Sequence, residues 1–268
     1  MYVDNILYPV TALGPGRRIV IWTAGCHRHC DGCANPELWE PRPYQKISPE
    51  RLADMVSGLM IQKEGQVDGL TITGGEPFEQ AQEICLFLDL LEGRFRDSRK
   101  ESRKERGEED QGQVLHLEQE PGQKLEQMPG KKPEQKPGQK LEQMPGKKPE
   151  QKPGQEPGQK PERMPEHETE QMEIFPCGIQ VFSGFLLEEL RGQKTGAALL
   201  DRIDVLIDGA YIKEQNDGKA VLRGSLNQRI HYLNPAMEGI YAPYLEEGRK
   251  IENFVYDYRT LSVGIHNP

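Results

Sequence analysis

The long repetitive stretch at residues 97–172 is the feature that most constrains how this chain can fold. Within it, the sequence GQKLEQMPGKKPEQKP at 122–137 recurs unchanged at 138–153. Pro-Gly pairs interrupt every potential helix, and strongly apolar residues are nearly absent. Such a stretch cannot bury enough apolar surface to offset the entropy lost on folding. We therefore expect a disordered low-complexity insertion, either an inactive expansion or a tether.

The two flanking pieces, residues 1–96 and 173–268, must then build one core together. Short apolar runs in them predict strands, and amphipathic stretches between the runs predict helices. Strands that alternate with helices imply a mostly parallel sheet with right-handed crossovers. We expect a single α/β domain whose strands include residues 19–22, 70–73, 179–182 and 203–207.

Two of the helices have clear signals. Ser48 is a typical N-cap, and Pro49 suits the first turn that follows it. Four apolar residues then share one helical face: Leu52, Met55, Val56 and Leu59. The second helix has an apolar side made of Ala81, Ile84, Cys85, Leu88 and Leu91.

Four glycine-containing loops directly follow the predicted strands. They are a cysteine-rich loop at 25–33, the turn at 74–77, and the pairs Ser183-Gly184 and Asp208-Gly209. In parallel α/β architectures, the loops after the carboxyl ends of the strands line the active site. The insertion instead follows a helix and precedes a strand, so we expect it at the opposite edge, away from the chemistry.

Three cysteines, Cys26, Cys30 and Cys33, have the spacing C-x3-C-x2-C. Thiolates this close together can hold one metal centre, but they are one ligand short of a closed four-coordinate site. The spacing suits a [4Fe–4S] cubane, because each thiolate can reach a different iron. An open coordination position indicates a site for chemistry and not a structural staple.

Zinc is the main alternative for this loop. His27 or His29 could complete a structural Cys3His site. Both histidines lie between the cysteines, however, where a tight loop would struggle to turn them inward, and a second pair of ligands further along is missing. From the spacing alone, zinc and unrelated cysteines stay open as alternatives.

The second motif is Gly74-Gly75-Glu76-Pro77, directly after the strand at 70–73. Two glycines remove Cβ atoms where a ligand must approach the backbone closely. Glu76 adds a carboxylate, and Pro77 opens the next helix. An ordinary strand-to-helix turn is the alternative, but the position one strand after the cysteine loop favours a ligand site.

Together these motifs resemble the radical S-adenosylmethionine superfamily, and most closely the branch that activates the anaerobic ribonucleoside-triphosphate reductase. Arg17-Arg18 before the loop, and Gly32 where many members of the superfamily have an aromatic residue, agree with that branch. The resemblance covers the chain outside 97–172. It rests on GCHRHCDGCANPELW (25–39), TITGGEPFEQ (71–80), FSGFLLEEL (182–190), IDVLIDGAYI (203–212) and RGSLNQRI (223–230).

The resemblance implies an incomplete parallel (βα) barrel with one [4Fe–4S] cluster. Cys26, Cys30 and Cys33 would each bind one iron, and the fourth iron would bind the amino and carboxylate groups of S-adenosylmethionine. A single electron would then cleave the S–C5′ bond of this cofactor. Further residues are implied to form the cofactor pocket: Gly32, Cys33 and Ala34 along the nucleoside, Gly74, Gly75 and Glu76 at the methionine end, and Ser183.

The resemblance also implies a partner. The radical formed from the cofactor would abstract hydrogen from a glycine Cα of the anaerobic ribonucleoside-triphosphate reductase, with flavodoxin or ferredoxin as electron donor. The alternatives are a radical enzyme with another protein or small-molecule substrate and, in a different class, a non-catalytic iron–sulfur or zinc protein. The motif at 74–77 favours the enzymatic reading, because a structural staple needs no methionine-binding turn.

Composition excludes several classes. The formal charge of −9 does not favour nucleic-acid binding. We see no signal peptide at the start and no apolar run long enough to span a membrane. Five cysteines, three of them in one motif, fit a reducing cytoplasm better than a disulfide framework.

Other residues are predicted to be structural. Cys85 and Cys177 are expected in the core as small apolar side chains. Trp22 and Trp39 are expected to wall the core and not to contact substrate. The segment 223–229 is either a plain turn into a strand or a loop that closes the pocket or docks a partner.

Overall fold

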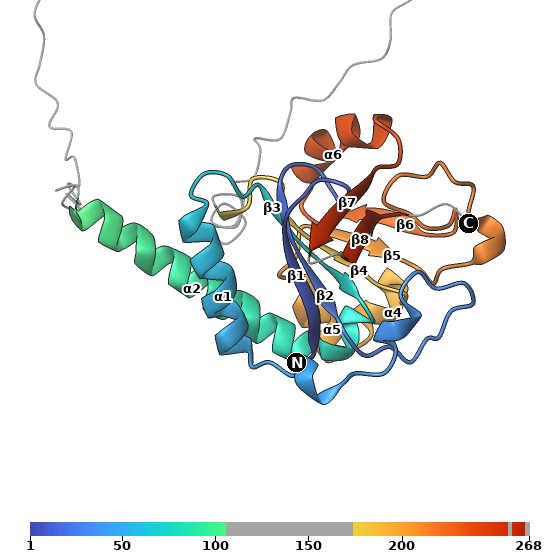
Figure 1. Cartoon of the computed structure of the whole chain (residues 1–268), viewed down its shortest axis with the longest axis horizontal. Coiled ribbons are helices and arrows are strands. Elements are labelled where there is room, and N and C mark those ends of the chain that lie inside the picture. Colours follow the sequence, from blue (N-terminus) through green and yellow to red (C-terminus); the bar gives the residue numbers. More distant parts are fainter. Residues whose placement is uncertain (106–173, 257–258, 266–268) are drawn as a thin grey trace, which may run out of the picture. The chain divides into compact units, whose positions relative to one another are not determined.

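The computed structural model describes residues 1–105, 174–256 and 259–265 (Figure 1). These residues belong to one compact unit. Most of the predicted disordered insertion lies outside the described residues. Its first part does not, because helix α2 (Ala81–Glu105) continues through residues 97–105. The boundary predicted at residue 97 therefore falls inside a helix.

A six-stranded sheet forms the centre of this unit, in the order β1-β2-β3-β4-β5-β6. The four inner strands β2 to β5 are parallel, as predicted, and β1 and β6 pair antiparallel at the two edges. The inner strands are almost wholly buried, as expected for parallel strands covered on both faces. Their bounds are β1 Val3–Val10, β2 Arg18–Thr23, β3 Gly69–Gly74, β4 Ile179–Phe182, β5 Val205–Asp208 and β6 Arg229–Tyr232.

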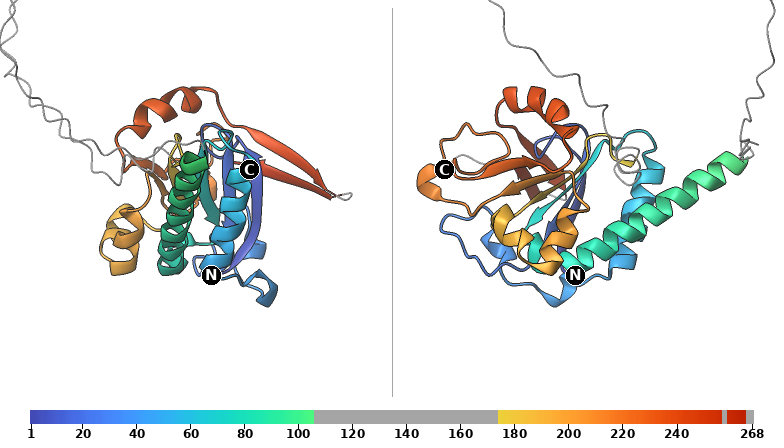
Figure 2. Two further views of the ribbon diagram at one scale, coloured as in Figure 1. Left: turned by 90° about the vertical axis from the view of Figure 1, so that its left-hand side faces the viewer. Right: turned by 180° about the vertical axis from the view of Figure 1, so that it is seen from behind.

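Helices α1 (Pro49–Gln62), α2, α4 (Leu187–Arg191) and α5 (Lys194–Leu200) follow the inner strands. Helices α1 and α2 lie side by side (Figures 1 and 2). They cover the sheet face to which alternate strand residues such as Ile19, Ile21, Leu70 and Ile72 point. Within the described residues, no helix is both long and apolar enough to span a membrane.

The start of α1 agrees with its sequence signals, because the Ser48 hydroxyl accepts a hydrogen bond from the Arg51 N–H at 3.3 Å. One predicted core residue is wrong: the Met55 side chain is 51% exposed. The buried stripe of α1 is rotated relative to the predicted face, so that Met55 falls beyond its edge. Its members are Leu52, Ala53, Val56 and Met60.

The other face of the sheet is covered by the C-terminal part of the chain. Helix α6 (Met237–Glu246) packs on Val205 and Ile207 of β5. The hairpin of β7 (Ile251–Tyr256) and β8 (Arg259–Gly264) packs through Val263 against β1 and β2. Figure 2 shows this hairpin as a separate two-stranded ribbon beside the main sheet.

A fully buried arginine joins the amino ends of the inner strands. The Arg18 guanidinium donates to the Thr71 hydroxyl and to the carbonyl oxygens of Pro15, Leu70, Cys177 and Gly178. Arginine can be buried without a carboxylate partner when its N–H groups are satisfied in this way. This contact ties the segment that enters β4 to the strands on its other side.

Candidate active site

A cavity of about 590 Å³ lies at the carboxyl edge of the parallel strands. Its walls come from the loops that follow β2, β3, β4 and β5, as predicted from the strand order. Every site residue predicted from the sequence lines this one cavity. They are Cys26, Cys30, Gly32, Cys33, Ala34, Gly74, Gly75, Glu76 and Ser183.

The cysteine loop is held by backbone contacts to the segment that follows it. The Gly25 N–H donates to the Leu38 carbonyl at 2.7 Å and the Cys26 N–H to the Trp39 carbonyl at 3.0 Å. Gly25 has a φ of +107°, a conformation that favours glycine. All three thiols are free and partly exposed, so they face the cavity as available ligands.

Backbone N–H groups point at two of the sulfurs. The Asn35 N–H donates to Cys33 Sγ at 3.4 Å. Burial raises the pKa of the Cys26 thiol, and the N–H groups of Arg28 and His29 oppose this rise. Such donors stabilise a thiolate and are typical partners of metal-bound sulfur.

Among the described residues, no three His, Cys, Asp or Glu side chains come close enough to hold a single ion. A single-ion zinc site needs its ligands to converge on one point. The thiolates of an iron–sulfur cluster bind different irons, so they need only to border one cavity. The three cysteines meet this second requirement, and this donor set therefore fits a cluster.

The glycine pair at the end of β3 packs against the cysteine loop. The N–H groups of Gly75 and Glu76 donate to the carbonyls of Thr23 and Gly25, both at 2.8 Å. A Cβ on Gly74 would clash with the Thr23 carbonyl, and one on Gly75 with the Gly25 carbonyl. The two glycines therefore allow the end of β2 and the cysteine loop to lie close to this turn. They also line the cavity.

Glu76 is only 1% exposed. Its carboxylate accepts hydrogen bonds from the Gly184 N–H at 2.7 Å, the Ser183 hydroxyl at 2.9 Å and the Phe78 N–H at 3.1 Å. Burial raises the pKa of Glu76 to about 7, although these three donors favour the charged form. The carboxylate thus joins the loops after β3 and β4.

The loop after β5 is held by the segment 223–229. Gln228 donates to the Gly209 carbonyl at 2.8 Å and accepts from the Gly224 N–H at 2.6 Å, while Asn227 donates to the Ala210 carbonyl at 2.7 Å. Gly224 and Gln228 both line the cavity. The segment is therefore part of the cavity wall as well as a turn into β6.

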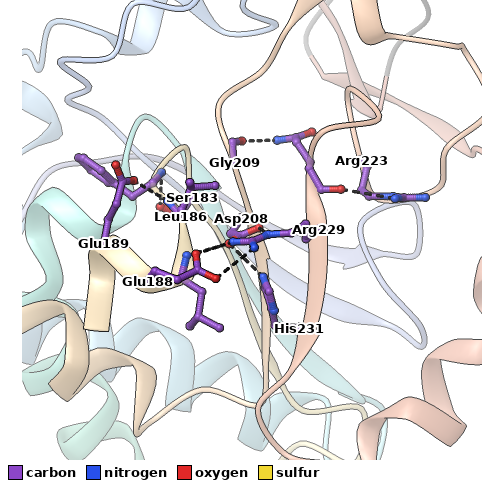
Figure 3. Close-up of polar contacts among 12 residues, drawn as sticks. Ser183, Leu186, Glu188, Glu189, Asp208, Gly209, Arg223, Arg229 and His231 are labelled. Atoms are coloured by element: carbon purple, nitrogen blue, oxygen red, sulfur yellow. Dashed lines mark hydrogen bonds and ion pairs between the residues drawn. The ribbon is translucent and has the colours of Figure 1, made fainter. Parts of the chain in front are cut away.

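An ion pair between Asp208 and Arg229 stabilises the loop after β5 (Figure 3). Asp208, fully buried at the end of β5, receives two hydrogen bonds from Arg229, which also reaches Glu188. Burial alone would raise the pKa of Asp208, but Arg229, the Leu187 N–H and His231 hold it below its usual value. The pair fixes the start of the loop that Gly209 begins.

Several cavity residues were not predicted from the sequence. Trp22 and Trp39, expected only in the core, line the cavity, and the Trp39 ring lies 4.6 Å from that of His29. Arg28 lies between Cys26 and Cys30, and this position in the cysteine motif is the only feature of the sequence that places it near the cavity. Other lining residues come from distant parts of the chain, among them Tyr211, Lys213, Asn216 and residues 261–265 of the C-terminal hairpin.

The other two cysteines are only partly buried. Cys85 packs against the core from α2, and Cys177 lies half-buried beside Gly16 and Asp68. Neither lines the cavity among its described residues. The prediction of a core position is met in part by Cys85, which borders the core, and is wrong for Cys177, which belongs to none of the core clusters of the described residues.

Comparison with known proteins shows the family. The chain matches the model of the 4Fe-4S single cluster domain over residues 12–109 and 169–231. It is 21% identical to the anaerobic ribonucleoside-triphosphate reductase-activating protein of Escherichia coli K12 over 230 residues, which are 84% of this chain and 96% of that protein. No solved structure gives a significant match.

Shorter matches agree with this. The phage T4 protein of the same name is 33% identical over 98 residues, so that the match spans 35% of this chain and 60% of the phage protein. The pyruvate formate-lyase-activating enzyme of Staphylococcus aureus USA300 is 30% identical over 84 residues, 31% of this chain and 34% of that enzyme. The chain belongs to the 4Fe-4S single cluster domain family and is an enzyme of its radical S-adenosylmethionine activase branch, with a [4Fe–4S] cluster and S-adenosylmethionine as cofactors.

Proposed function

We propose that this enzyme cleaves S-adenosylmethionine reductively and generates a glycyl radical on an anaerobic ribonucleoside-triphosphate reductase. The observation that carries the proposal is the single cavity lined by all three thiols of the C-x3-C-x2-C loop and by the turn at Gly74 to Glu76. A structural metal site would not need this second loop. We assign Cys26, Cys30 and Cys33 as the cluster ligands.

When bound, the cluster supplies the single electron that breaks the S–C5′ bond of S-adenosylmethionine. The residues of this chain would bind the cluster and S-adenosylmethionine and orient them. The N–H group of Gly75 already donates to Thr23 at the end of β2 and that of Glu76 to Gly25 in the cysteine loop, so the turn would contact the cofactor's ammonium through carbonyl oxygens, which accept. This contact would place the methionine end of the cofactor beside the thiols.

The remaining assigned residues shape the two ends of the pocket. Backbone at Gly32, Cys33 and Ala34 would lie along the nucleoside, on the side where Tyr211 and Lys213 approach Gly32. Ser183 has a supporting role in this proposal, because its hydroxyl donates to Glu76 and accepts from the Phe185 N–H. Apolar lining residues such as Trp22 and Phe182 would exclude water from the reacting atoms.

The proposed target rests on the extent of the matches. Several relatives named as activators of the reductase, the Escherichia coli K12 protein among them, align over 84% of this chain, whereas the Staphylococcus aureus enzyme named for pyruvate formate-lyase aligns over 31%. A glycine is a suitable target because its backbone radical is accessible and stabilised by the flanking amide groups. Flavodoxin or ferredoxin is proposed as the electron donor.

The test is anaerobic reconstitution with iron and sulfide, followed by dithionite and S-adenosylmethionine. We expect 5′-deoxyadenosine from the wild type and from C85A, and none from C30A, which removes an assigned ligand. A wild-type chain with a complete cluster that forms no 5′-deoxyadenosine would contradict the enzymatic proposal. Cleavage without a glycyl signal in electron paramagnetic resonance, when the reductase is added, would contradict the proposed target only.

A further inference from the structure

Trp39 lies beside the cysteine loop and belongs to the wall of the cavity that the three thiols border. Its backbone carbonyl accepts a hydrogen bond from the Cys26 N–H at 3.0 Å. Its ring lies 4.6 Å from the ring of His29, with an angle of 34° between the two planes. Trp39 therefore contacts the loop at one assigned ligand and again between that ligand and Cys30.

The contact with His29 supports an uncommon backbone conformation. His29 has a φ of +46°, in the left-handed region that residues other than glycine rarely adopt. In this conformation its N–H is one of the donors that oppose the rise in the pKa of the Cys26 thiol. The indole ring thus packs on a residue whose backbone already donates to a ligand sulfur. Trp39 therefore lies against the part of the loop that surrounds Cys26.

The indole N–H of Trp39 has no acceptor in the described part of the chain. Its Nε1 is buried there without a hydrogen-bond partner. A buried tryptophan N–H usually has an acceptor, and this nitrogen can only donate. The face of the His29 ring does not serve, because the two rings are closer to stacked than to edge-on and the N–H lies in the plane of the indole. A ligand that brings an acceptor to this point removes the cost of the unpaired donor.

The two cofactors of the cavity are the candidates for this acceptor. Both contacts of Trp39 described above are with the cysteine loop, at Cys26 and His29. The cluster binds to this loop, and its inorganic sulfides lie between irons that the three thiolates hold. Within the described residues none of the thiols accepts the indole N–H. The observations therefore favour a sulfide of the cluster over an atom of S-adenosylmethionine.

We propose that the Trp39 indole N–H donates a hydrogen bond to a sulfide of the bound [4Fe–4S] cluster and thereby raises the reduction potential of the cluster. The inference rests on the ligand assignment in the proposed function. Reduction adds one electron to the cluster, and a donor at sulfur stabilises the added negative charge. Trp39 would thus make the cluster easier to reduce for its electron donor, the proposed flavodoxin or ferredoxin.

The test is a redox titration of the anaerobically reconstituted chain, in the absence of S-adenosylmethionine, with the reduced cluster followed by electron paramagnetic resonance. W39F keeps an apolar aromatic ring but has no N–H. We expect it to lower the equilibrium constant for one-electron reduction about 3- to 10-fold, which is measured as a more negative midpoint potential. Y44F is the control, because it removes an O–H from an exposed ring that is not part of the described cavity wall, and it should equal the wild type.

An unchanged potential in cluster-loaded W39F would overturn the inference. A shift that appears only when S-adenosylmethionine is bound would also overturn it, because the acceptor would then belong to that cofactor. Iron and sulfide contents are measured for every variant, so that only loaded chains are compared.

A second measurement decides the case in which W39F loads no cluster. The full chain is produced with nitrogen-15 in its indole rings, and its reduced cluster is studied by pulsed electron paramagnetic resonance. We expect a hyperfine coupling to nitrogen-15 that W22F, which removes the other indole of the chain, retains. The absence of this coupling, or its loss in W22F, would overturn the inference. A loaded wild type that does not cleave S-adenosylmethionine would instead contradict the proposed function.

Discussion

The Ser183 hydroxyl donates a hydrogen bond to Glu76 Oε1 at 2.9 Å, and this contact links the loops after β3 and β4. Both side chains are buried, at 5% and 1% exposure. The same hydroxyl accepts a hydrogen bond from the Phe185 N–H at 3.0 Å. A small polar side chain at the end of β4 thereby positions a carboxylate on the cavity wall.

Replacing Ser183 with alanine should destabilise the fold by about 1–3 kcal/mol, because Glu76 loses a donor while it stays buried. The measurement is the free energy of unfolding in urea. S57A is the matched control, because the Ser57 hydroxyl on α1 is exposed and only contacts the Asp54 carbonyl. An S183A variant as stable as S57A would show that Glu76 does not depend on this donor.

The pH dependence of stability should carry the signature of Glu76. The pKa of this carboxyl is raised to about 7 in the folded chain from a usual value of 4.5, so the folded state binds the proton more tightly than the unfolded state. The stabilising contribution of the protonated form is therefore complete below pH 4.5 and is lost as the pH rises to about 7.

E76Q removes this titration. The wild type should lose stability relative to E76Q between pH 5 and pH 7.5, by a few kcal/mol, as measured by urea unfolding of both chains in the same cluster state. A constant difference across that range would contradict the raised pKa. The comparison with E76Q cancels the titration of the other groups.

The two carboxylates that pair with Arg229, Asp208 and Glu188, should contribute unequally to the free energy of unfolding. R229M leaves Asp208 buried without its main partner, and we expect a loss of about 3–5 kcal/mol in unfolding free energy. E188A removes the exposed carboxylate on the other side of Arg229 and should cost much less, because solvent screens that pair. Equal effects of the two variants in urea unfolding would contradict this assignment.

The glycine at position 75 should be required for cluster loading. G75A places a methyl group against the Gly25 carbonyl and should displace the cysteine loop, which lowers the iron content after reconstitution. G58A is the control, because Gly58 on α1 faces open space. That variant should load iron normally and gain about 0.5–1 kcal/mol of stability, since alanine favours a helix over glycine.

Removing the repetitive insertion should leave 5′-deoxyadenosine formation intact. Because α2 continues to Glu105, the deletion should spare that helix and replace residues 110–160 with a short Gly-Ser linker. The control is the full-length chain with the same cluster content. Loss of cleavage in a folded, cluster-loaded deletion variant would show that the insertion contributes to the chemistry.

Much of the site could be predicted from the sequence, because its residues directly follow predicted strands. Val20 lies in the apolar run 19–22 and Ile72 in the alternating segment 70–73, and each segment ends at a glycine-containing loop. Four such loops at one edge of a parallel sheet must converge. That is why all nine predicted residues line one cavity.

The features that could not be predicted from the sequence depend on contacts between residues far apart in the chain. Met55 has the right spacing for the core but falls outside the stripe that α2 and the sheet actually cover. The antiparallel strand β1 has polar residues such as Asp4 and Asn5 within it, so its pattern is weak. The position of the Arg28 side chain depends on its approach to Gly184, which no local pattern encodes.

The C-terminal hairpin has a consequence for how the enzyme is made. Residues 261–265 form part of the cavity wall, but they are synthesised long after Cys26, Cys30 and Cys33. A chain still on the ribosome therefore carries its three thiols before that wall exists. That side of the cavity is complete only when the hairpin has packed through Val263 against β1 and β2.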